Sequence, residues 1–409
     1  MKKHCCVLIY NSFRDPLFQN IMLPYMRTLI TSSGWSFHLI TFEQPEYSID
    51  PVEKEKIYKR LSDDCIYWYP RRHRTGRFLI VKKALDFVSV GILLFRLRIQ
   101  GIRVLWSFAN VAASIAWVYS RLLAYRTIIY SYEPHSDFMR ELGLWGKDSL
   151  NYRILSALEQ RAGRDADYLM TGTQYMVDEL TARGIGGKVY RAPTSSDETK
   201  FYPVPDARKA VEQQFGINPD EKIILYLGKF GGLYYRSEIL QMFRILSQQI
   251  PTSRFVVITP NSHDEIVDLC KQVNFDHRRL IYIRNPPFEV IRDWLSAAHL
   301  GVTAIPPTPS QKYRSPTKVA EYLMCGLPYI TVAGVSEDDI IATEYDVGIV
   351  VKDFSENSIS AAIPAIVDFL KRDRTEMIRR CREVGIMYRG KANVDRILKS
   401  IFSELERSG

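Results

Sequence analysis

The stretch that decides the fold is residues 315–330, which read SPTKVAEYLMCGLPYI. Ser315 is a favoured N-cap residue, and Pro316 is favoured as the first residue of a helix. Gly326 is typical of the end of a helix, and Pro328 leads into an apolar run with strand propensity. The stretch therefore predicts a short helix that begins at Ser315 and is followed at once by a buried β-strand.

Similar apolar runs recur along the chain and are separated by amphipathic segments. We predict strands at 7–10, 37–42, 104–108, 127–132, 168–171, 223–227, 255–259, 280–284, 300–304, 329–332 and 348–351. Strands that alternate with helices form parallel sheets with helices on both faces. The pattern predicts an α/β protein built from doubly wound, Rossmann-like domains.

The chain is too long for one hydrophobic core. It has 409 residues, 46% of them hydrophobic and 25% charged, and a single core stops growing near roughly 250–300 residues. Prolines and polar residues interrupt the strand–helix pattern near the middle of the chain, which is typical of a linker. We predict a first domain at 1–195, a linker at 196–215, a second domain at 216–385, and a closing amphipathic helix at 386–409 that returns to the first domain. The default site is a cleft at the carboxyl ends of the strands.

Lys318 falls in the first turn of the helix predicted from Ser315. A cation there opposes the positive end of the helix dipole. The placement is explained if an anion binds, because backbone N–H groups, the dipole and the ammonium would hold a diphosphate together. Glu321 lies one turn later on the same face, where it is placed to accept hydrogen bonds from a ribose. The alternative is a plain Lys–Glu pair on a surface helix.

A glycine-rich loop follows a predicted strand earlier in the same half of the chain. Residues 225–235 read LYLGKFGGLYY. Gly228, Gly231 and Gly232 allow the backbone to approach a ligand closely, and Lys229 is placed to contact phosphate. Alone, such a loop is most often an ordinary turn. Its value comes from its occurrence in the same half-chain as the 315–330 segment.

The second half of the chain resembles the donor domain of GT-B-fold glycosyltransferases, particularly the retaining family 4. The matching pieces are GKFGGLY at 228–234, AAHLGV at 297–302 and the segment 315–330, while DETKF at 197–201 resembles the crossing between domains. The resemblance implies two Rossmann-like domains that face a cleft. It also implies transfer of a sugar from a nucleotide-diphosphate donor to a glycan or lipid-linked acceptor, with retention and without metal, in cell-surface polysaccharide or glycolipid synthesis.

The resemblance implies roles for individual residues. Lys229 and Lys318 would bind the diphosphate, and Glu321 the ribose. On the N-terminal side, His135 would hydrogen-bond a sugar hydroxyl or the reacting centre. If the reaction instead inverts, it needs a general base, and the candidates are Asp15, Glu133 and His135. The predicted catalytic residues are therefore His135, Glu133 and Lys318. The predicted donor-binding residues are Gly228, Lys229, Gly231, Gly232, Arg284, Asn285, Ser315, Pro316, Thr317, Lys318 and Glu321.

Several positions depart from the family pattern. The family often has two glutamates separated by seven residues, and Tyr313 stands in place of the first. Lys229 stands where the family pattern has an arginine. The pattern also expects a second lysine after this position, and other residues replace it near Tyr234 or Arg236. The N-terminal glycine-rich loop is replaced by NSFRDP at 11–16. These departures concern the sugar and the mechanism more than the fold.

The net charge of +9 predicts an anionic partner. Basic residues gather at 71–77, directly before an apolar stretch, which is typical of a membrane-surface element. A solvated basic loop before a core helix explains the run equally well. An anionic membrane surface is thus a candidate partner, and the basic segment 71–98 favours a lipid-linked or membrane-proximal acceptor. Nucleic acid is not expected, because the basic run lacks interleaved aromatic residues.

The six cysteines form no C-x-x-C pair and accompany no histidine cluster. Free thiols in apolar runs predict a reducing, cytoplasmic compartment. Within it, the cytoplasmic face of the membrane is a candidate location. The first ten residues predict a strand rather than a secretory signal. The apolar stretch 104–120 predicts a buried strand and helix rather than a membrane span.

No cofactor is expected, and no metal site. The D-x-D spacing at 165–167 lies away from the phosphate segment, so we interpret it as structural. A dehydrogenase is excluded because no G-x-G-x-x-G follows a strand. Two alternatives remain open: a nucleotide-sugar epimerase of the same fold, and a nucleotide-sugar-binding scaffold without catalysis.

Overall fold

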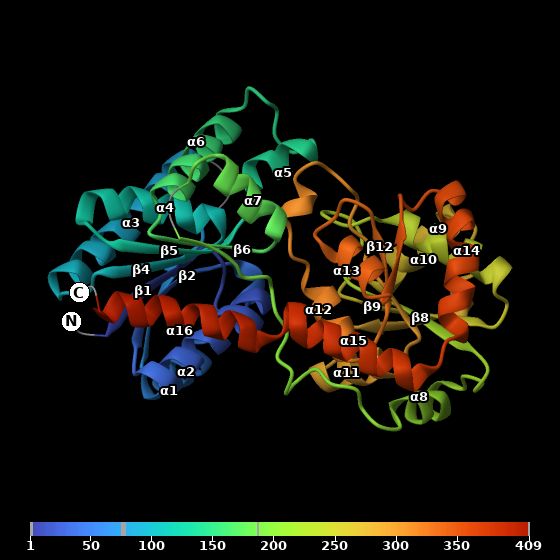
Figure 1. Ribbon diagram of the computed structural model, residues 1–409. Helices are drawn as coiled ribbons and strands as arrows, with labels where there is room; N and C mark the ends of the chain where they lie inside the picture. The colour runs from blue at the N-terminus through green and yellow to red at the C-terminus, as the bar shows by residue number, and fades with distance from the viewer. Residues whose placement is uncertain (1–2, 75–78, 186–187, 408–409) are drawn as a thin grey trace. The chain divides into compact units, whose positions relative to one another are not determined.

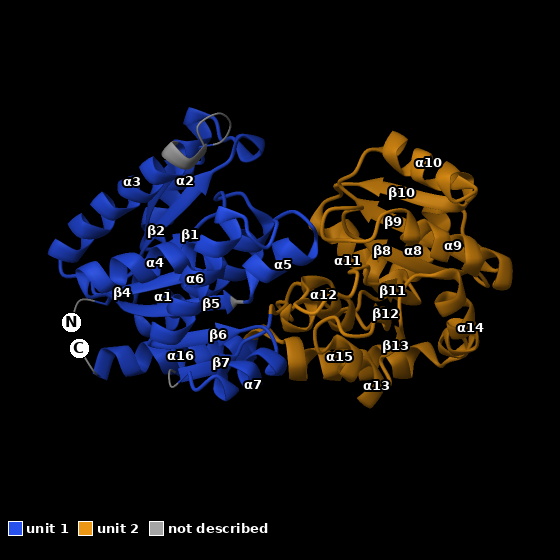
Figure 2. Ribbon diagram, turned by 90° about the horizontal axis from the view of Figure 1, so that it is seen from above, with its two compact units in different colours: residues 1–193, 392–409 blue, residues 194–391 orange. Residues whose placement is uncertain are grey.

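The computed structural model describes residues 3–74, 79–185 and 188–407. The chain forms two compact units, shown in different colours in Figure 2. Unit 1 comprises Met1–Pro193 and Ala392–Gly409, and unit 2 comprises Thr194–Lys391. Each unit contains a parallel sheet with helices packed on it, so the predicted α/β class with two doubly wound, Rossmann-like domains is confirmed.

Unit 1 is built on a sheet with the strand order β3-β2-β1-β4-β5-β6-β7 in its described residues. Its strands are β1 (His4–Ile9), β2 (Ser36–Glu43), β3 (Ile66–Arg72), β4 (Val104–Phe108), β5 (Arg126–Tyr132), β6 (Tyr168–Thr171) and β7 (Lys188–Arg191). Its helices are α1 (Leu23–Ser33), α2 (Pro51–Asp63), α3 (Leu79–Ile99), α4 (Ala109–Leu123), α5 (His135–Glu141), α6 (Leu150–Asp165), α7 (Gln174–Ala182) and α16 (Lys391–Arg407). The order reverses between β1 and β4, which is the switch point of this sheet.

The apolar run of β1 is continuous because both faces of the sheet are covered. Cys5, Val7 and Ile9 belong to a core that includes side chains of α1, α2 and α16. Cys6 and Leu8 belong to a second core, with side chains of α3 and α4. Successive strand residues point to opposite faces, and Figure 1 shows the two sets of helices on the two sides of this sheet.

The two strands that sequence analysis does not predict, β3 and β7, are the edges of the unit 1 sheet. In β3 only Ile66 and Trp68 are buried, and Pro70 lies within the strand. An edge strand is half-exposed and tolerates proline and charge, so it lacks the apolar run of a central strand. The basic run begins here, with Arg71 and Arg72, while its part at 75–78 lies outside the described residues.

Unit 2 is built on a sheet with the strand order β10-β9-β8-β11-β12-β13 in its described residues, and its switch point lies between β8 and β11. Its strands are β8 (Lys222–Leu227), β9 (Ser253–Thr259), β10 (Leu280–Arg284), β11 (Leu300–Val302), β12 (Tyr329–Val332) and β13 (Gly348–Val351). Its helices are α8 (Ala207–Phe215), α9 (Ser237–Gln249), α10 (His263–Gln272), α11 (Phe288–Ala297), α12 (Thr317–Met324), α13 (Asp338–Glu344), α14 (Glu356–Lys371) and α15 (Arg374–Arg389).

The segment 196–215, for which composition predicts a linker, lies in unit 2 and contains α8. Each predicted strand overlaps an observed strand, and the stretch 104–120 forms β4 and most of α4, as predicted. Within the described ranges, every helix is too short or too polar to cross a bilayer.

Five of the six cysteines are buried free thiols: Cys5, Cys6, Cys270, Cys325 and Cys381. Burial raises the pKa of the Cys6 thiol to about 12 and that of Cys270 to about 11. Cys65, between α2 and β3, is exposed. The interior thiols therefore act as small apolar side chains.

The last helix, α16, completes the core of unit 1. Its buried face comprises Val394, Leu398, Ile401, Phe402 and Leu405. The Phe402 ring contacts the rings of Trp35, Phe37 and Trp106, at centroid distances of 4.8, 6.0 and 5.6 Å.

We expect Phe402→Ala to lower the free energy of unfolding of unit 1 by about 3–5 kcal/mol, because it removes a fully buried ring and leaves a cavity. Lys399→Ala, on the exposed side of the same helix, is the control and should change it by less than about 0.5 kcal/mol. Urea titration monitored by tryptophan fluorescence measures both variants. Equal small effects would show that α16 does not stabilise unit 1.

Candidate active site

The predicted donor-binding residues of unit 2 all follow carboxyl ends of parallel strands. The loop 228–232 follows β8, and Arg284 and Asn285 lie at the end of β10. Residues 315–321 follow β11 after a loop and form the start of α12. β8 and β11 are hydrogen-bonded neighbours at the switch point of the sheet. The fold therefore brings the glycine-rich loop and α12 to the edge where ligands of doubly wound sheets bind.

Helix α12 begins one residue later than predicted. It spans Thr317–Met324, its N-cap residue is Pro316, and no side chain caps it. The Ser315 hydroxyl instead accepts a hydrogen bond from the Thr194 backbone N–H at 2.9 Å and another from Arg389. The prediction that Ser315 caps the helix is wrong because this hydroxyl is bound outside the helix. The first turn of α12 therefore presents backbone N–H groups that no side chain caps.

Arg389 holds the segment that leads into α12. Its side chain is fully buried and forms an ion pair with the buried carboxylate of Asp338. It also donates to the hydroxyls of Ser315 and Ser336. Burial of a charge is tolerated only when the charge is paired and hydrogen-bonded, as it is here. Sequence analysis missed Arg389, although it follows Met377, Cys381, Val384 and Gly385 on the buried face of α15.

Lys318 and Glu321 form an ion pair on α12, with 3.1 Å between Nζ and Oε2. The Lys318 side chain is 29% exposed and that of Glu321 only 15%. The pair predicted as the surface alternative is thus present. It is more buried than a typical surface pair, and it lies beside the uncapped turn of α12.

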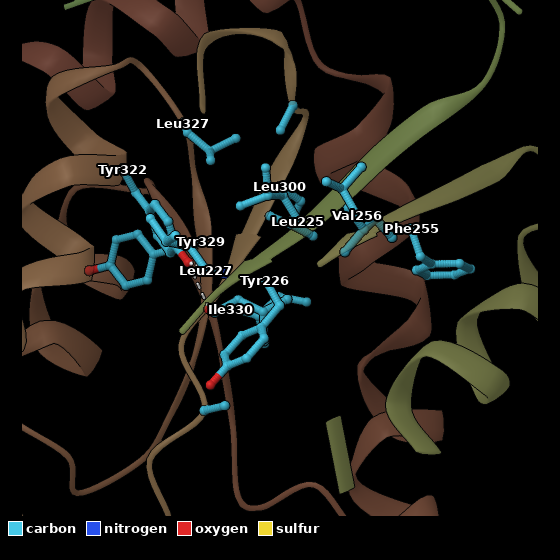
Figure 3. Close-up of a cluster of buried hydrophobic side chains, with 14 of the residues drawn as sticks. Leu225, Tyr226, Leu227, Phe255, Val256, Leu300, Tyr322, Leu327, Tyr329 and Ile330 are labelled. Atoms are coloured by element: carbon cyan, nitrogen blue, oxygen red, sulfur yellow. Dashed lines mark hydrogen bonds between the residues drawn. The ribbon is translucent and has the colours of Figure 1, made fainter. Parts of the chain in front are cut away.

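Tyr322 anchors α12 to the sheet. Its fully buried hydroxyl accepts a hydrogen bond from the Leu227 N–H at 3.3 Å and donates to the Val302 carbonyl at 3.0 Å. These residues end β8 and β11, and Figure 3 shows Tyr322 beside Leu227 and Tyr226. Gly301 makes room for this ring, because a Cβ there would lie 2.8 Å from it. The position of α12 is therefore fixed relative to the loop that follows β8.

The glycine-rich loop turns sharply after β8. Gly231 and Gly232 have φ of 81° and 67°, values that favour glycine. A Cβ on Gly228 would lie 2.7 Å from the Tyr226 hydroxyl, which donates to the Lys229 carbonyl. The Lys229 side chain is exposed at this loop. The glycines thus shape a turn that presents a cation at the ligand-binding edge.

Arg284 and Asn285 lie further from α12 along the same edge. β10 is separated from β8 by β9, a distance of about 10 Å at the usual strand spacing. Arg284 donates to the Pro260 carbonyl at 3.3 Å, and Asn285 is exposed with a φ of 43°. The structure therefore places Arg284 and Asn285 on the same edge of the sheet, but away from the loop that follows β8.

In unit 1, Glu133 and His135 follow β5. The Glu133 N–H donates to the Asn110 side chain at 3.2 Å, and the Asn110 amide donates to the Glu133 carbonyl. His135 is the first residue of α5, and its ring meets the Trp145 ring edge-on at a centroid distance of 6.3 Å. Ser131, just before this segment, has a φ of 60°, a strained conformation that clusters at functional sites.

Glu159, which sequence analysis missed, lies beneath this segment. It is 4% exposed and accepts hydrogen bonds from the Ser136 N–H and hydroxyl. Burial raises the pKa of the Glu159 carboxyl to about 7, although the Ser136 hydrogen bonds oppose the shift. A glutamate within the amphipathic pattern of α6 gives no sequence signal that it is buried.

The D-x-D residues are bound within unit 1. Asp165 accepts a hydrogen bond from the Trp117 indole N–H at 2.9 Å. Asp167 accepts one from the Thr127 N–H at 2.8 Å. These contacts agree with the structural interpretation of the motif.

We expect Arg389→Met to lower the free energy of unfolding of unit 2 by about 3–5 kcal/mol, because it leaves the Asp338 carboxylate buried without a partner. The double variant Arg389→Met/Asp338→Leu, which removes both charges, should recover part of that loss. Arg379→Met, an exposed arginine of the same helix, is the control. Urea titration measures all three, and a double variant less stable than the single one would contradict the pairing argument.

Stability of unit 1 should depend on pH through Glu159. The pKa of this carboxyl is raised from 4.5 to about 7 in the folded chain, so its favourable contribution is complete below pH 4.5 and is lost as the pH rises through 7. The shift corresponds to roughly 3 kcal/mol. The stability difference between wild type and Glu159→Gln should therefore fall over this range, as measured by urea unfolding at several pH values. Glu55→Gln, at an exposed glutamate, is the control. The stability difference between wild type and this variant should not change with pH.

Comparison with known proteins adds evidence on the fold. No family model matches the sequence, and no curated protein matches it. Among solved structures, sucrose-phosphate synthase from Thermosynechococcus elongatus is similar with a TM-score of 0.72 and 16% identity, over 99% of this chain and 100% of that one. HepE from Anabaena in complex with UDP has a TM-score of 0.70 and 10% identity, over 98% and 100%. WaaG, a glycosyltransferase involved in lipopolysaccharide biosynthesis, has a TM-score of 0.67 and 12% identity, over 98% and 99%. The chain therefore has the GT-B fold.

Proposed function

We propose that this protein is a glycosyltransferase that moves a sugar from a nucleotide-diphosphate donor to a glycan or lipid-linked acceptor. One observation carries the proposal: the uncapped first turn of α12, with Lys318 and Glu321, starts beside the strand ends that bear Lys229 and its glycine-rich loop. Solved structures of HepE, which has the same fold, contain UDP, UDP with glucose, or UDP-glucose. These likenesses support a nucleotide-sugar donor.

The donor binds through its diphosphate in this proposal. Backbone N–H groups of α12 and the ammonium groups of Lys318 and Lys229 hold the phosphate oxygens. The Lys318–Glu321 pair separates, so that Lys318 binds phosphate while Glu321 accepts hydrogen bonds from the ribose hydroxyls. Arg284 and Asn285, further along the edge, lie beside the base.

The chemical step breaks the bond between the anomeric carbon and the phosphate oxygen of the donor. Negative charge develops on the leaving diphosphate, and the cations that bind it stabilise that charge. We propose that the acceptor hydroxyl attacks from the face that the diphosphate leaves, as in the retaining family 4, and that a phosphate oxygen takes the acceptor proton. Lys229 and Lys318 supply the positive charge, so no metal ion is required.

The residues after β5 act on the sugar in this proposal. His135 hydrogen-bonds a sugar hydroxyl, and the buried Glu159 beneath it positions the first turn of α5 through Ser136. Glu133, His135 and Asp15 are the candidate bases for an inverting reaction. The enzyme acts in the cytoplasm, at the membrane surface, in the synthesis of a cell-surface polysaccharide or glycolipid.

Lys318→Ala should weaken the binding of UDP or another nucleoside diphosphate by about tenfold to a hundredfold, because it removes a charge-assisted contact to phosphate. Isothermal titration with UDP, GDP, ADP and their sugars measures the affinity and identifies the base. Lys271→Ala is the matched control, since Lys271 forms the same kind of i, i+3 pair with Asp268 on another helix of unit 2.

Binding should persist in EDTA if no metal participates. Unchanged affinity in Lys318→Ala would contradict the donor site at α12. Transfer is then followed by NMR of the product, whose anomeric configuration distinguishes retention from inversion. Donor binding without transfer would favour the scaffold, and interconversion of nucleotide-sugars without an acceptor would favour the epimerase.

A further inference from the structure

A cationic pocket of about 680 Å³ lies in unit 1, and none of the candidate active-site residues lines it. It opens where β2 and β3 end, and Glu43 and Arg72 are paired neighbours there. The side chains that give the pocket its charge are Lys54, Arg72, Arg74, Lys82 and one carboxylate, Glu43. Arg74 is paired with Asp86, but Lys54, Arg72 and Lys82 still outnumber Glu43, so the pocket favours an anionic ligand.

The one carboxylate of this pocket, Glu43, is hydrogen-bonded within the protein. Glu43 accepts hydrogen bonds from the Thr41 hydroxyl at 2.5 Å and the Phe13 N–H at 3.1 Å. Burial raises the pKa of the Glu43 carboxyl, although these hydrogen bonds oppose the shift. Glu43 also attracts the Lys54 ammonium, so this one carboxylate offsets one of the pocket's cations and leaves the others in excess.

His73 also lines the pocket, and its ring is held by a neighbouring cation. His73 Nε2 lies 3.1 Å from the Lys83 ammonium, which can only donate. The proton of a neutral His73 must then be on Nδ1, and that buried atom has no partner among the described residues.

An exposed apolar stripe begins at the same pocket. Leu85 lines the pocket and is the first of five large apolar side chains on one face of α3. Their exposures are 52–70%: Leu85, Val88, Ile92, Phe95 and Ile99. At helical spacing they fall within an arc of about 80° and extend over about 20 Å. Residues on the opposite face, such as Val90 and Leu94, pack in the core, and Figure 2 shows α3 on the outer side of unit 1.

The charges of α3 indicate what covers this stripe. The helix contains Lys82, Lys83, Arg96 and Arg98 but only one acid, Asp86. That acid is 2% exposed and forms ion pairs with Arg74 and Lys83. A second copy of α3 would meet a surface of like charge. An anionic lipid surface complements both the apolar stripe and its cations.

We propose that unit 1 contains a binding site for a phosphate-bearing lipid, whose headgroup lies in the cationic pocket and whose hydrocarbon chain lies against the α3 stripe. If the lipid is the acceptor of the transferred sugar, the proposal deepens the proposed function and rests on it. The binding of lipid by itself does not depend on that function, because all residues of the site lie in unit 1 and none belongs to the donor site. It accounts for the basic run before an apolar helix, which the donor site does not use.

The test is flotation of the full chain with vesicles of phosphatidylcholine alone or mixed with phosphatidic acid. We expect binding to the mixed vesicles only. Lys54→Ser/Arg72→Ser and Ile92→Ser/Phe95→Ser should each weaken it by about tenfold. The controls are Lys59→Ser, on another face of the helix that bears Lys54, and Ile154→Ser, an isoleucine of α6 with 50% exposure against 52% for Ile92.

The proposal is overturned if the wild-type chain binds neither kind of vesicle, or if the control variants lose as much vesicle binding as the test variants. It is also overturned if light scattering shows a dimer that Ile92→Ser/Phe95→Ser disrupts, because a second copy would then cover the stripe. Retention of inorganic phosphate by the pocket without vesicle binding would assign it to free phosphate instead of a lipid. Nucleoside-diphosphate affinity is measured on the same variants and should not change. Loss of vesicle binding alone rejects the lipid site, whereas absence of nucleotide binding in wild type rejects the proposed function.

Discussion

The buried charge of Arg389 is the interaction on which the candidate donor site depends. Its guanidinium binds Asp338, Ser336 and Ser315. Its backbone carbonyl accepts from the Ser196 N–H at 2.9 Å, and the Ser196 carbonyl accepts from the Lys391 N–H at 3.1 Å. Unit 2 continues into unit 1 at both of its ends, near Ser196 and near Lys391. These two segments are hydrogen-bonded to each other beside Arg389, the residue that holds Ser315 in front of α12. The first of these segments also contacts Ser315 directly through the Thr194 N–H.

Parallel sheets impose the second constraint. Their central strands are buried on both faces, so β1 and β8 offer few polar side chains along their length. Polar and glycine-rich segments are confined to the loops, and only the loops at the carboxyl ends gather at the switch points. In unit 2 this edge carries α12 and the loop after β8. In unit 1 it carries the β5 segment and, near the sheet's edge, the cationic pocket.

The central strands and α12 could be predicted because their signals are local: apolar runs, a proline at the start and a glycine at the end. The role of Ser315 could not, since its hydroxyl is bound by Thr194 and Arg389, which are distant in sequence. Arg389 and Glu159 were missed for the same reason: burial and partners decide their roles. The edge strands β3 and β7 could not be predicted, because half-exposed strands have no continuous apolar run.

The distribution of thiols makes the two units separately observable. In the folded chain an alkylating reagent meets one exposed sulfur, that of Cys65, while the buried thiols are shielded and, at raised pKa, not ionised. Cys5 and Cys6 become reactive only when unit 1 opens, and Cys270, Cys325 and Cys381 only when unit 2 opens. Mass spectrometry of the labelled peptides over time would thus measure two opening rates in the same sample, one for each unit.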